Sequence, residues 1–184
     1  MRADKKELEN ERTDRYEHIV HPFPPLYDAG SEILILGSLP SVKSREQMFF
    51  YGHPQNRFWK VMSSVLQEQL PVTIEEKKSM LHAHHIALWD AIYSCDIIGS
   101  SDSSIKNVTP TDLSEIVSGS KVTKILCNGR TSGKYYAKYQ YKNLKIEPVI
   151  LPSTSPANAA FSVERLVEAW GAEVPDKCIY IDRR

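Results

Sequence analysis

Apolar residues gather in four short runs along the chain, and each run ends at a glycine, aspartate, asparagine or proline. The runs span residues 32–36, 85–89, 122–127 and 144–151. Their length and their content of β-branched residues are typical of buried strands, and an uninterrupted apolar run indicates a strand covered on both faces. The pattern therefore predicts four strands of one largely parallel sheet.

Between these runs the apolar residues recur at helical spacing. This spacing, with the capping signals, predicts helices at 56–70, 74–84, 109–118, 130–141 and 162–170. In the third helix Thr109 is the expected cap and Pro110 the first helical residue, and Ser162 is the expected cap of the last helix. Strands that alternate with helices indicate the α/β class, with helices on both faces of the sheet.

The remaining segments lack these patterns. Residues 1–18 alternate acidic and basic side chains, which predicts a peripheral helix or a tail, and residues 20–25 are too rich in proline to be helical. Serine, glycine and aspartate in 96–109 predict a loop, and 178–182 suggests a short edge strand. With 184 residues and no internal repeat, the chain is expected to form a single domain over 1–184.

Polar residues follow the end of each predicted strand. They are Gly37–Asn56, Asp90, Asn128 and Pro152–Asn158. In open α/β sheets ligands bind at the carboxyl ends of the strands, where the strand order reverses. The first stretch is long and rich in aromatic residues, so we expect it to be functional rather than disordered. These segments predict a ligand site at one edge of the sheet.

The charge pattern leaves the partner open. Lys and Arg together number 23, as do Asp and Glu, so the formal net charge is zero and counts mildly against a nucleic-acid-binding protein. Between residues 121 and 145, however, every charged residue is basic, and tyrosines are interleaved. This segment predicts either a solvated helix face or a surface that faces phosphates.

Several kinds of cofactor site are poorly supported. The three cysteines are widely spaced and form neither a metal-ligand pattern nor a disulfide framework, which suits a reducing cell interior. His82, His84 and His85 have no carboxylate in a metal-binding motif, so solvated side chains are expected there. No nucleotide-binding glycine motif, signal peptide or long apolar segment occurs. We expect no cofactor, no metal and no membrane partner, and a monomer in the cytoplasm, or in the nucleus of a eukaryote.

The side chains at the predicted sheet edge restrict the chemistry. Ser38 and Ser41 lack the motif and the histidine base of a serine nucleophile. Asn56 and Asn128 are amides, which can position a water or bind a polar ring. They suit a reaction with a highly dissociated transition state, such as cleavage of an N-glycosidic bond, with nearby aromatic rings stacking on a base turned out of a duplex. Alternatively, the aromatic residues belong to the core and the asparagines cap helices or form turns.

Four motifs together resemble those of a known enzyme family. They are Gly37-Ser-Leu-Pro-Ser41, His53-Pro-Gln-Asn-Arg-Phe-Trp59, Asn128 after the third strand, and Leu151–Asn158. Their joint occurrence in this order is similar to the uracil-DNA glycosylase superfamily, and most of all to its DNA-deoxyinosine (hypoxanthine-DNA) glycosylase branch. The second motif is shared with the mismatch-specific uracil/thymine glycosylases. The resemblance covers roughly residues 20–170.

The resemblance implies a three-layer α/β/α sandwich around a four-stranded parallel sheet of order 2-1-3-4. It implies that Asn56 orients the attacking water, and that Asn128 contacts the flipped base or assists its departure. The segment Pro152–Asn158 is similar to the loop that pinches the DNA backbone in this family. Most members carry Asp or Asn in the first motif, whereas this chain has Ser38-Leu39, which argues against ordinary uracil excision.

The resemblance predicts a monofunctional DNA glycosylase of base excision repair that acts on DNA containing deaminated bases, hypoxanthine first. No lysine occupies a motif position, so strand cleavage is not expected. The alternatives are a uracil or G·T mismatch glycosylase, a non-catalytic binder of damaged DNA, and a small-molecule hydrolase. The predicted substrate-binding residues are Gly37, Ser38, Pro40, Ser41, Phe49, Phe50, Tyr51 and His53. The predicted DNA-binding residues are Arg57, Arg130, Lys134, Ser153, Ser155, Pro156, Ala157 and Asn158.

Overall fold

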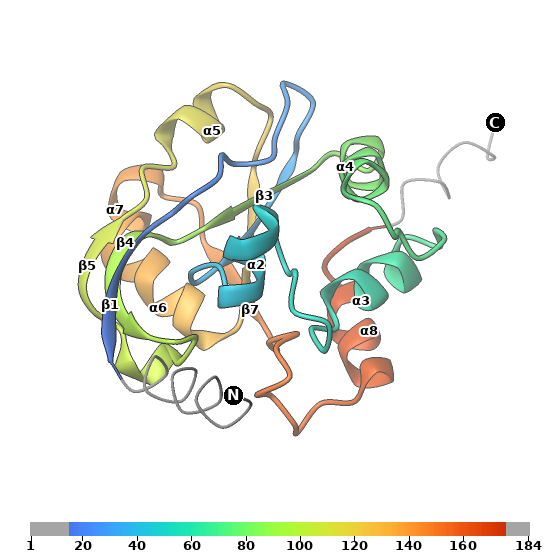
Figure 1. Ribbon diagram of the computed structural model, residues 1–184. Helices are drawn as coiled ribbons and strands as arrows, with labels where there is room; N and C mark the ends of the chain where they lie inside the picture. Colours follow the sequence, from blue (N-terminus) through green and yellow to red (C-terminus); the bar gives the residue numbers. More distant parts are fainter. Residues whose placement is uncertain (1–14, 176–184) are drawn as a thin grey trace, which may run out of the picture.

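The computed structural model, which describes residues 15–175, has a central sheet of four parallel strands (Figure 1). In chain order these strands are β2 (Ile33–Gly37), β3 (Ile86–Asp90), β6 (Lys124–Asn128) and β7 (Pro148–Leu151). Their spatial order is β3-β2-β6-β7, which confirms the predicted order 2-1-3-4. The strand order reverses between β2 and β6, where a ligand site is expected.

The register of the sheet brings the ends of the strands together. Gly37 at the end of β2 is paired with Asp90 at the end of β3, and Asn128 at the end of β6 is paired with Leu151 at the end of β7. All five residues of β2 are buried, as expected for a central strand covered on both faces. The polar residues that follow the four strands therefore share one edge of the sheet.

Helices cover both faces of this sheet, so the predicted three-layer sandwich is confirmed (Figure 1). One side carries α3 (Phe58–Val65), α4 (Ile74–Ala83) and α8 (Val163–Gly171), and the other carries α5 (Ser114–Ser118), α6 (Arg130–Tyr139) and α7 (Tyr141–Leu144). Phe58 and Trp170 meet edge to face between α3 and α8, and both are fully buried. Ser162 caps α8 through its side chain, as predicted.

A second sheet, which the sequence did not predict, flanks the central one. It consists of β1 (Tyr16–Val20), β4 (Ile92–Ile98) and β5 (Lys106–Pro110), paired antiparallel in the order β1-β4-β5. The predicted loop at 96–109 is wrong, because its serine-rich part is only the hairpin tip, with the short helix η1 (Asp102–Ser104). The predicted helix start at Thr109 is also wrong. Pro110 instead ends an edge strand, where its missing N–H is tolerated.

Several boundaries differ from the predicted ones. A short helix, α2 (Val42–Gln47), lies inside the long segment after β2, and α3 ends at Val65 rather than at residue 70. The last strand begins at Pro148 rather than at residue 144, because Leu144 ends α7 and Lys145 caps that helix. Strand β1 includes the end of the predicted helix or tail at 1–18. The rest of that segment, up to residue 14, and the predicted strand at 178–182 lie outside the described residues.

Candidate active site

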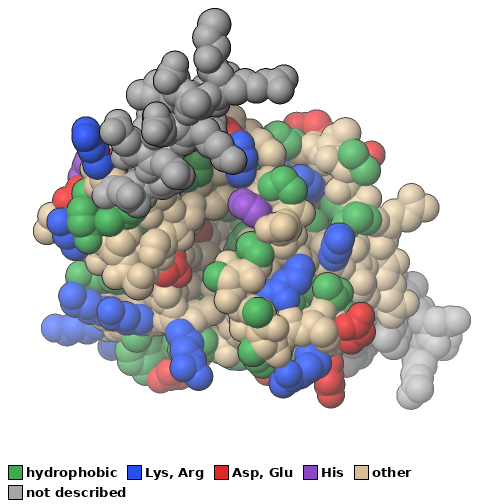
Figure 2. Space-filling model, turned by 60° about the horizontal axis from the view of Figure 1, so that its bottom comes forward, with side chains coloured by type: hydrophobic (Ala, Val, Ile, Leu, Met, Phe, Trp, Pro, Cys, Tyr) green, Lys and Arg blue, Asp and Glu red, His purple; other side chains and the backbone are tan. Residues whose placement is uncertain are grey.

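A cavity of about 1050 Å³ opens at the carboxyl edge of the central sheet. Its lining comes from the ends of all four strands and from the loops that follow them. Figure 2 shows a hollow on this side of the molecule, with acidic side chains inside it and Lys and Arg side chains around it. The predicted site residues that line the cavity are Gly37, Ser38, Pro40, Ser41, Phe50, Tyr51, His53, Asn56, Asn128, Arg130, Ser153, Ser155, Pro156, Ala157 and Asn158.

The amide of Asn56 has a fixed direction. Its Oδ1 accepts hydrogen bonds from the backbone N–H of Phe58 at 2.9 Å and from the hydroxyl of Thr154 at 3.0 Å. A backbone N–H can only donate, so the oxygen rather than the nitrogen of the amide faces Phe58. Both lone-pair directions of Oδ1 are then used, and the Nδ2 group is the part of Asn56 left to act in the cavity.

Asn128 is held by the same threonine. Its Oδ1 accepts from the backbone N–H of Thr154 at 2.9 Å, and its Nδ2 donates to the Thr154 hydroxyl at 2.9 Å. The same amide also interacts with the hydroxyl of Tyr51. Asn128 therefore has partners on both ends of its amide within the protein. This arrangement favours a role in positioning Tyr51 and Thr154 over the predicted direct contact with a base.

Tyr51 joins the first loop to this network. Its ring stacks on Phe58 with the ring centroids 3.8 Å apart, and its backbone adopts a left-handed conformation with φ of 53°. Such a conformation is unfavourable for an aromatic residue, so the surrounding contacts must hold it. Burial raises the pKa of the Tyr51 hydroxyl well above its usual range, and the negative charge of Asp90 raises it further. The hydroxyl therefore keeps its proton and remains a donor at the cavity.

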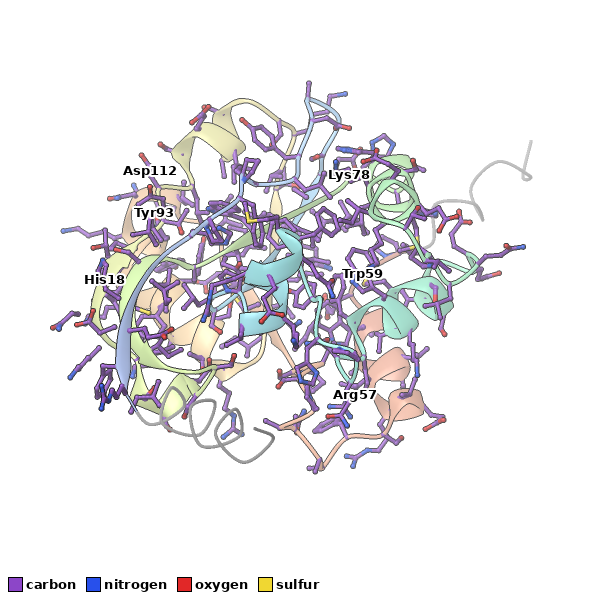
Figure 3. The ribbon with its side chains drawn as sticks, viewed as in Figure 1. His18, Arg57, Trp59, Lys78, Tyr93 and Asp112 are labelled. Carbon is purple, nitrogen blue, oxygen red and sulfur yellow. The ribbon has the colours of Figure 1, made fainter. Side chains whose placement is uncertain are left out.

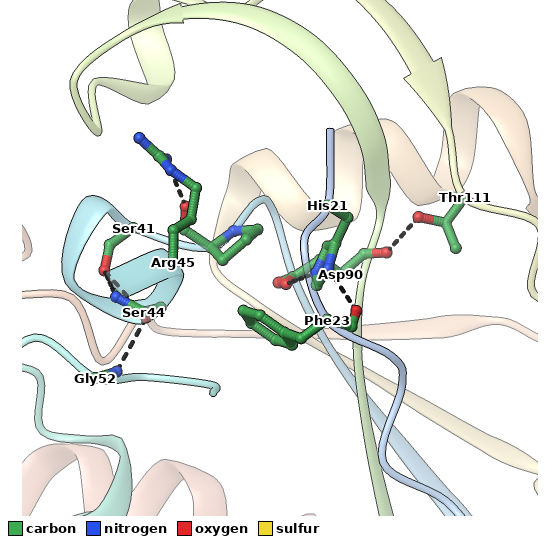
Figure 4. Close-up of polar contacts among 9 residues, drawn as sticks. His21, Phe23, Ser41, Ser44, Arg45, Gly52, Asp90 and Thr111 are labelled. Carbon is green, nitrogen blue, oxygen red and sulfur yellow. Dashed lines mark hydrogen bonds and ion pairs between the residues drawn. The ribbon is translucent and has the colours of Figure 1, made fainter. Parts of the chain in front are cut away.

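Asp90 is a buried acid at the cavity, and the predicted site residues did not include it. Its Oδ2 lies 2.8 Å from Nε2 of His21, whose Nδ1 lies 3.0 Å from the carbonyl of Phe23 (Figure 4). A carbonyl only accepts, so Nδ1 carries a proton, and the short contact to Asp90 requires a second proton between ring and carboxylate. The pair is therefore neutral as a whole.

The other carboxylate oxygen of Asp90 faces the end of β2. A Cβ atom at Gly37 would lie 2.1 Å from this Oδ1, so only glycine lets the carboxylate reach this position. The hydroxyl of Thr111 donates to the Asp90 carbonyl at 2.8 Å and fixes the backbone there (Figure 4). The sequence carried one signal for this residue, since Asp90 directly ends a buried strand.

The serines of the first motif are engaged with protein groups. Ser41 caps α2 by accepting from the backbone N–H of Ser44, and Ser44 in turn accepts from the N–H of Gly52 (Figure 4). The hydroxyl of Ser38 donates to Asp102 at the cavity rim, at 3.2 Å. These contacts shape the loop around the cavity, and they leave the serines as parts of its wall rather than as nucleophiles.

Arg57 is half-buried, and its guanidinium is engaged with backbone groups of the protein. Its guanidinium donates to the backbone carbonyls of Thr154, Ser155, Asn158 and Phe161. Figure 3 shows the side chain directed toward the segment that precedes α8. Because four carbonyls use its donors, the structure assigns Arg57 to shaping the loop at 152–161 in place of the predicted contact with phosphate.

Two further predicted residues do not line the cavity. Phe49 is buried and stacks on Trp59 in the core, which corrects its prediction as a substrate-binding residue. Lys134 lies one helical turn beyond Arg130 on α6, exposed outside the cavity rim. Pro156 and Ala157 are exposed at the rim, at the tip of the loop that Arg57 holds.

The histidines at the end of α4 form contacts with protein groups away from the cavity, and His84 is buried, so the prediction of a solvated side chain is wrong there. His82 pairs with Asp28, His84 with Glu68, and His85 with the carbonyl of Gly30. Within residues 15–175 no group of three or more metal-ligating side chains occurs. In the same residues no helix has the length and apolar character needed to cross a bilayer.

The chain is similar to known proteins in both sequence and fold. The sequence profile of the uracil DNA glycosylase superfamily matches residues 24–172. A protein of Methanosarcina acetivorans named hypoxanthine DNA glycosylase is 36% identical over 152 residues, covering 82% of this chain and 94% of the relative. One of the same name from Methanosarcina barkeri (strain Fusaro) is 35% identical over 138 residues, covering 74% and 86%. A solution NMR structure from M. acetivorans, provisionally assigned as a uracil DNA glycosylase, has a TM-score of 0.73 at 34% identity and covers 85% of this chain and 97% of its own.

Proposed function

Because the chain belongs to the uracil DNA glycosylase superfamily, we propose that it hydrolyses the N-glycosidic bond of deaminated bases in DNA, with hypoxanthine as its first substrate. DNA glycosylase activity itself follows from the family and from the named relatives. The choice of base, the place in base excision repair, and a monomeric enzyme in the cytoplasm are parts of the proposal. The names of the two relatives support hypoxanthine as the first substrate.

The observation that carries the proposal is the fixed direction of the Asn56 amide at the cavity. With both lone-pair directions of Oδ1 occupied by Phe58 and Thr154, the Nδ2 group can donate to the oxygen of a water. That water keeps a second lone pair for attack on C1′ of the sugar. Attack on a sugar that is already oxocarbenium-like needs a positioned water more than a strong base, which an amide can supply.

Asp90 offers a means of selecting the base. Hypoxanthine, xanthine and uracil each carry a ring N–H beside a carbonyl, whereas adenine and cytosine have an acceptor nitrogen at the corresponding position. A flipped base is read along this edge, and Oδ1 of Asp90 is an acceptor for such an N–H. His21 keeps the pair neutral, so the departing base, which carries negative charge, does not meet a net negative site. We infer that Asp90 favours deaminated bases over adenine and cytosine.

The acceptor oxygen of Asp90 also supports a second candidate function. Uracil and thymine also present a ring N–H beside a carbonyl, so Asp90 would accept them too. A uracil or G·T mismatch glycosylase is therefore the alternative that the site supports. Within residues 15–175 no lysine lines the cavity, so none of these side chains is placed to form a Schiff base with the sugar, which supports a monofunctional enzyme.

Base preference is tested with end-labelled duplexes that carry a single hypoxanthine, uracil, xanthine or G·T site, incubated with excess enzyme. Alkali then converts abasic sites into strand breaks. We expect breaks at hypoxanthine fastest, and none without alkali. Breaks at uracil alone would indicate the alternative function, a uracil glycosylase. Breaks before alkali would contradict the monofunctional mechanism.

The outer face of α6 provides a surface for the DNA backbone. Arg130, Lys134 and Lys138 follow one another at four-residue spacing, which places them on one face of the helix, and all three are exposed. Arg130 also lines the cavity, so the row leads away from its rim. We infer that it contacts phosphates and that DNA affinity falls as salt rises.

The double substitution of Lys134 and Lys138 by glutamine is expected to reduce the slope of log affinity against log salt by about 2, since each phosphate contact contributes about 0.9. Fluorescence anisotropy with a labelled duplex at several salt concentrations measures this slope. Lys78→Gln on α4, on the far side of the sheet, is the matched control and should leave it unchanged. An unchanged slope in the double variant would contradict the contact.

A further inference from the structure

We propose that Thr154 is the positioning residue that couples the two amides of the site, and that its hydroxyl keeps the Nδ2 group of Asn56 directed for the reaction. The inference rests on the glycosylase function proposed above and adds a residue that the predicted site did not contain. Thr154 acts through Asn56 and Asn128 and does not itself contact the reacting atoms.

Thr154 is fully buried, and each of its polar atoms bonds to another segment of the chain. Its backbone N–H donates to Asn128 Oδ1 at 2.9 Å, and its hydroxyl accepts from Asn128 Nδ2 at 2.9 Å. The hydroxyl donates to Asn56 Oδ1 at 3.0 Å. Its carbonyl accepts from the backbone N–H and from Nε of Arg57, at 3.1 and 3.2 Å. One residue thus joins the end of β6 to the loop before α3.

The directions of these bonds leave no alternative arrangement. The Thr154 N–H can only donate, so Oδ1 of Asn128 faces it, and Nδ2 of Asn128 must be the group near the hydroxyl. That amide donates, so the single proton of the hydroxyl is free to go to Asn56 Oδ1. The direction of one amide therefore determines the direction of the other, although 72 residues separate Asn56 from Asn128 in the sequence.

The hydroxyl serves the amides and not the loop. Arg57 holds the loop through backbone carbonyls, including that of Thr154, and these contacts do not involve the hydroxyl. Both hydrogen bonds of the hydroxyl go to Asn56 and Asn128. Removing it should therefore leave the loop in place and allow the two amides to rotate. A small misplacement of a positioning group is sufficient to slow a reaction about 100-fold.

The test compares Thr154→Val, which keeps the shape and the backbone contacts, with Thr154→Ser, which keeps the hydroxyl. Single-turnover excision of hypoxanthine is followed at increasing enzyme concentration, giving a saturating rate and a half-saturating concentration. We expect Thr154→Val to lower the saturating rate about 10- to 100-fold with a half-saturating concentration within about threefold of the wild type. Thr154→Ser should stay within about threefold in both quantities.

A control separates positioning from stability. Ser132→Ala removes another fully buried hydroxyl, which donates to the Leu36 carbonyl at 2.7 Å, and it should lower the melting temperature without changing the saturating rate. The inference is overturned if Thr154→Val is as fast as the wild type. It is also overturned if Thr154→Ser is as slow as Thr154→Val. A wild-type protein inactive on every duplex would instead contradict the proposed function, so the two failures have different signatures.

Discussion

Replacing Asn56 by alanine is expected to lower the single-turnover rate of hypoxanthine excision about 100- to 1000-fold, the size of effect seen when a preorganised donor is removed from an active site. The amide is held by Phe58 and Thr154 before any substrate arrives, so its effect should fall on the chemical step. Affinity for the duplex should change little, because Lys134 and Lys138, which are proposed to contact phosphates, lie outside the cavity. Rapid quench with excess enzyme measures the rate, and anisotropy measures the affinity.

Asn56→Asp is the matched variant, because it keeps the shape, replaces the NH2 group that faces the cavity by an oxygen, and adds a negative charge. One carboxylate oxygen would still accept from Phe58 and Thr154, and the other would present an acceptor in place of the N–H donors. If the N–H group holds the water, this variant should be as slow as the alanine variant. An aspartate variant as fast as the wild type would show that a hydrogen-bond acceptor at this position is sufficient to hold the water. Full activity in Asn56→Ala would remove the residue from the mechanism altogether.

Replacing Asp90 by leucine is expected to lower the excision of hypoxanthine about 100-fold or more. Leucine is larger but has the same branching at Cγ and no acceptor, so the N–H of a bound base would lose its partner, and His21 would lose its carboxylate. Sites built to bond a polar substrate group discriminate strongly when that bond is lost. Single-turnover rates on hypoxanthine and uracil duplexes measure the effect, which should appear with both bases because both carry the N–H.

Asp90→Asn tests the same contact more finely. Its amide nitrogen can donate to Nε2 of a neutral His21, which leaves the amide oxygen facing Gly37 and the cavity as an acceptor. This variant should therefore keep activity within about tenfold of the wild type. A tenfold change in rate corresponds to about 1.4 kcal/mol in the activation free energy. Equal losses in the leucine and asparagine variants would indicate that charge, and not hydrogen-bond acceptance, is what Asp90 provides. Unchanged activity in Asp90→Leu would contradict any role in base recognition.

The central sheet could be predicted from the sequence because its evidence is local. Each strand is a short apolar run closed by a turn residue, and alternation with helices indicates a parallel sheet. The second sheet could not be predicted in this way. Strand β4 begins only one residue after β3 ends, and β5 is mostly exposed, so neither has the apolar pattern of a buried strand. Only their pairing with each other and with β1 makes them strands.

For the site, the sequence by itself determined which residues reach the sheet edge. Asn56, Asn128 and the loop at 152–158 belong to stretches that follow predicted strands, and parallel strands end at the same edge. Only the tertiary structure decided what each side chain does there. The burial of Asp90 beside His21, the hydrogen bond from Thr154 to Asn56, and the use of Arg57 as a loop clamp all depend on hydrogen-bond partners that lie 69 to 104 residues apart. Such partners leave no periodic pattern in the sequence, because the contact exists only once the chain has folded.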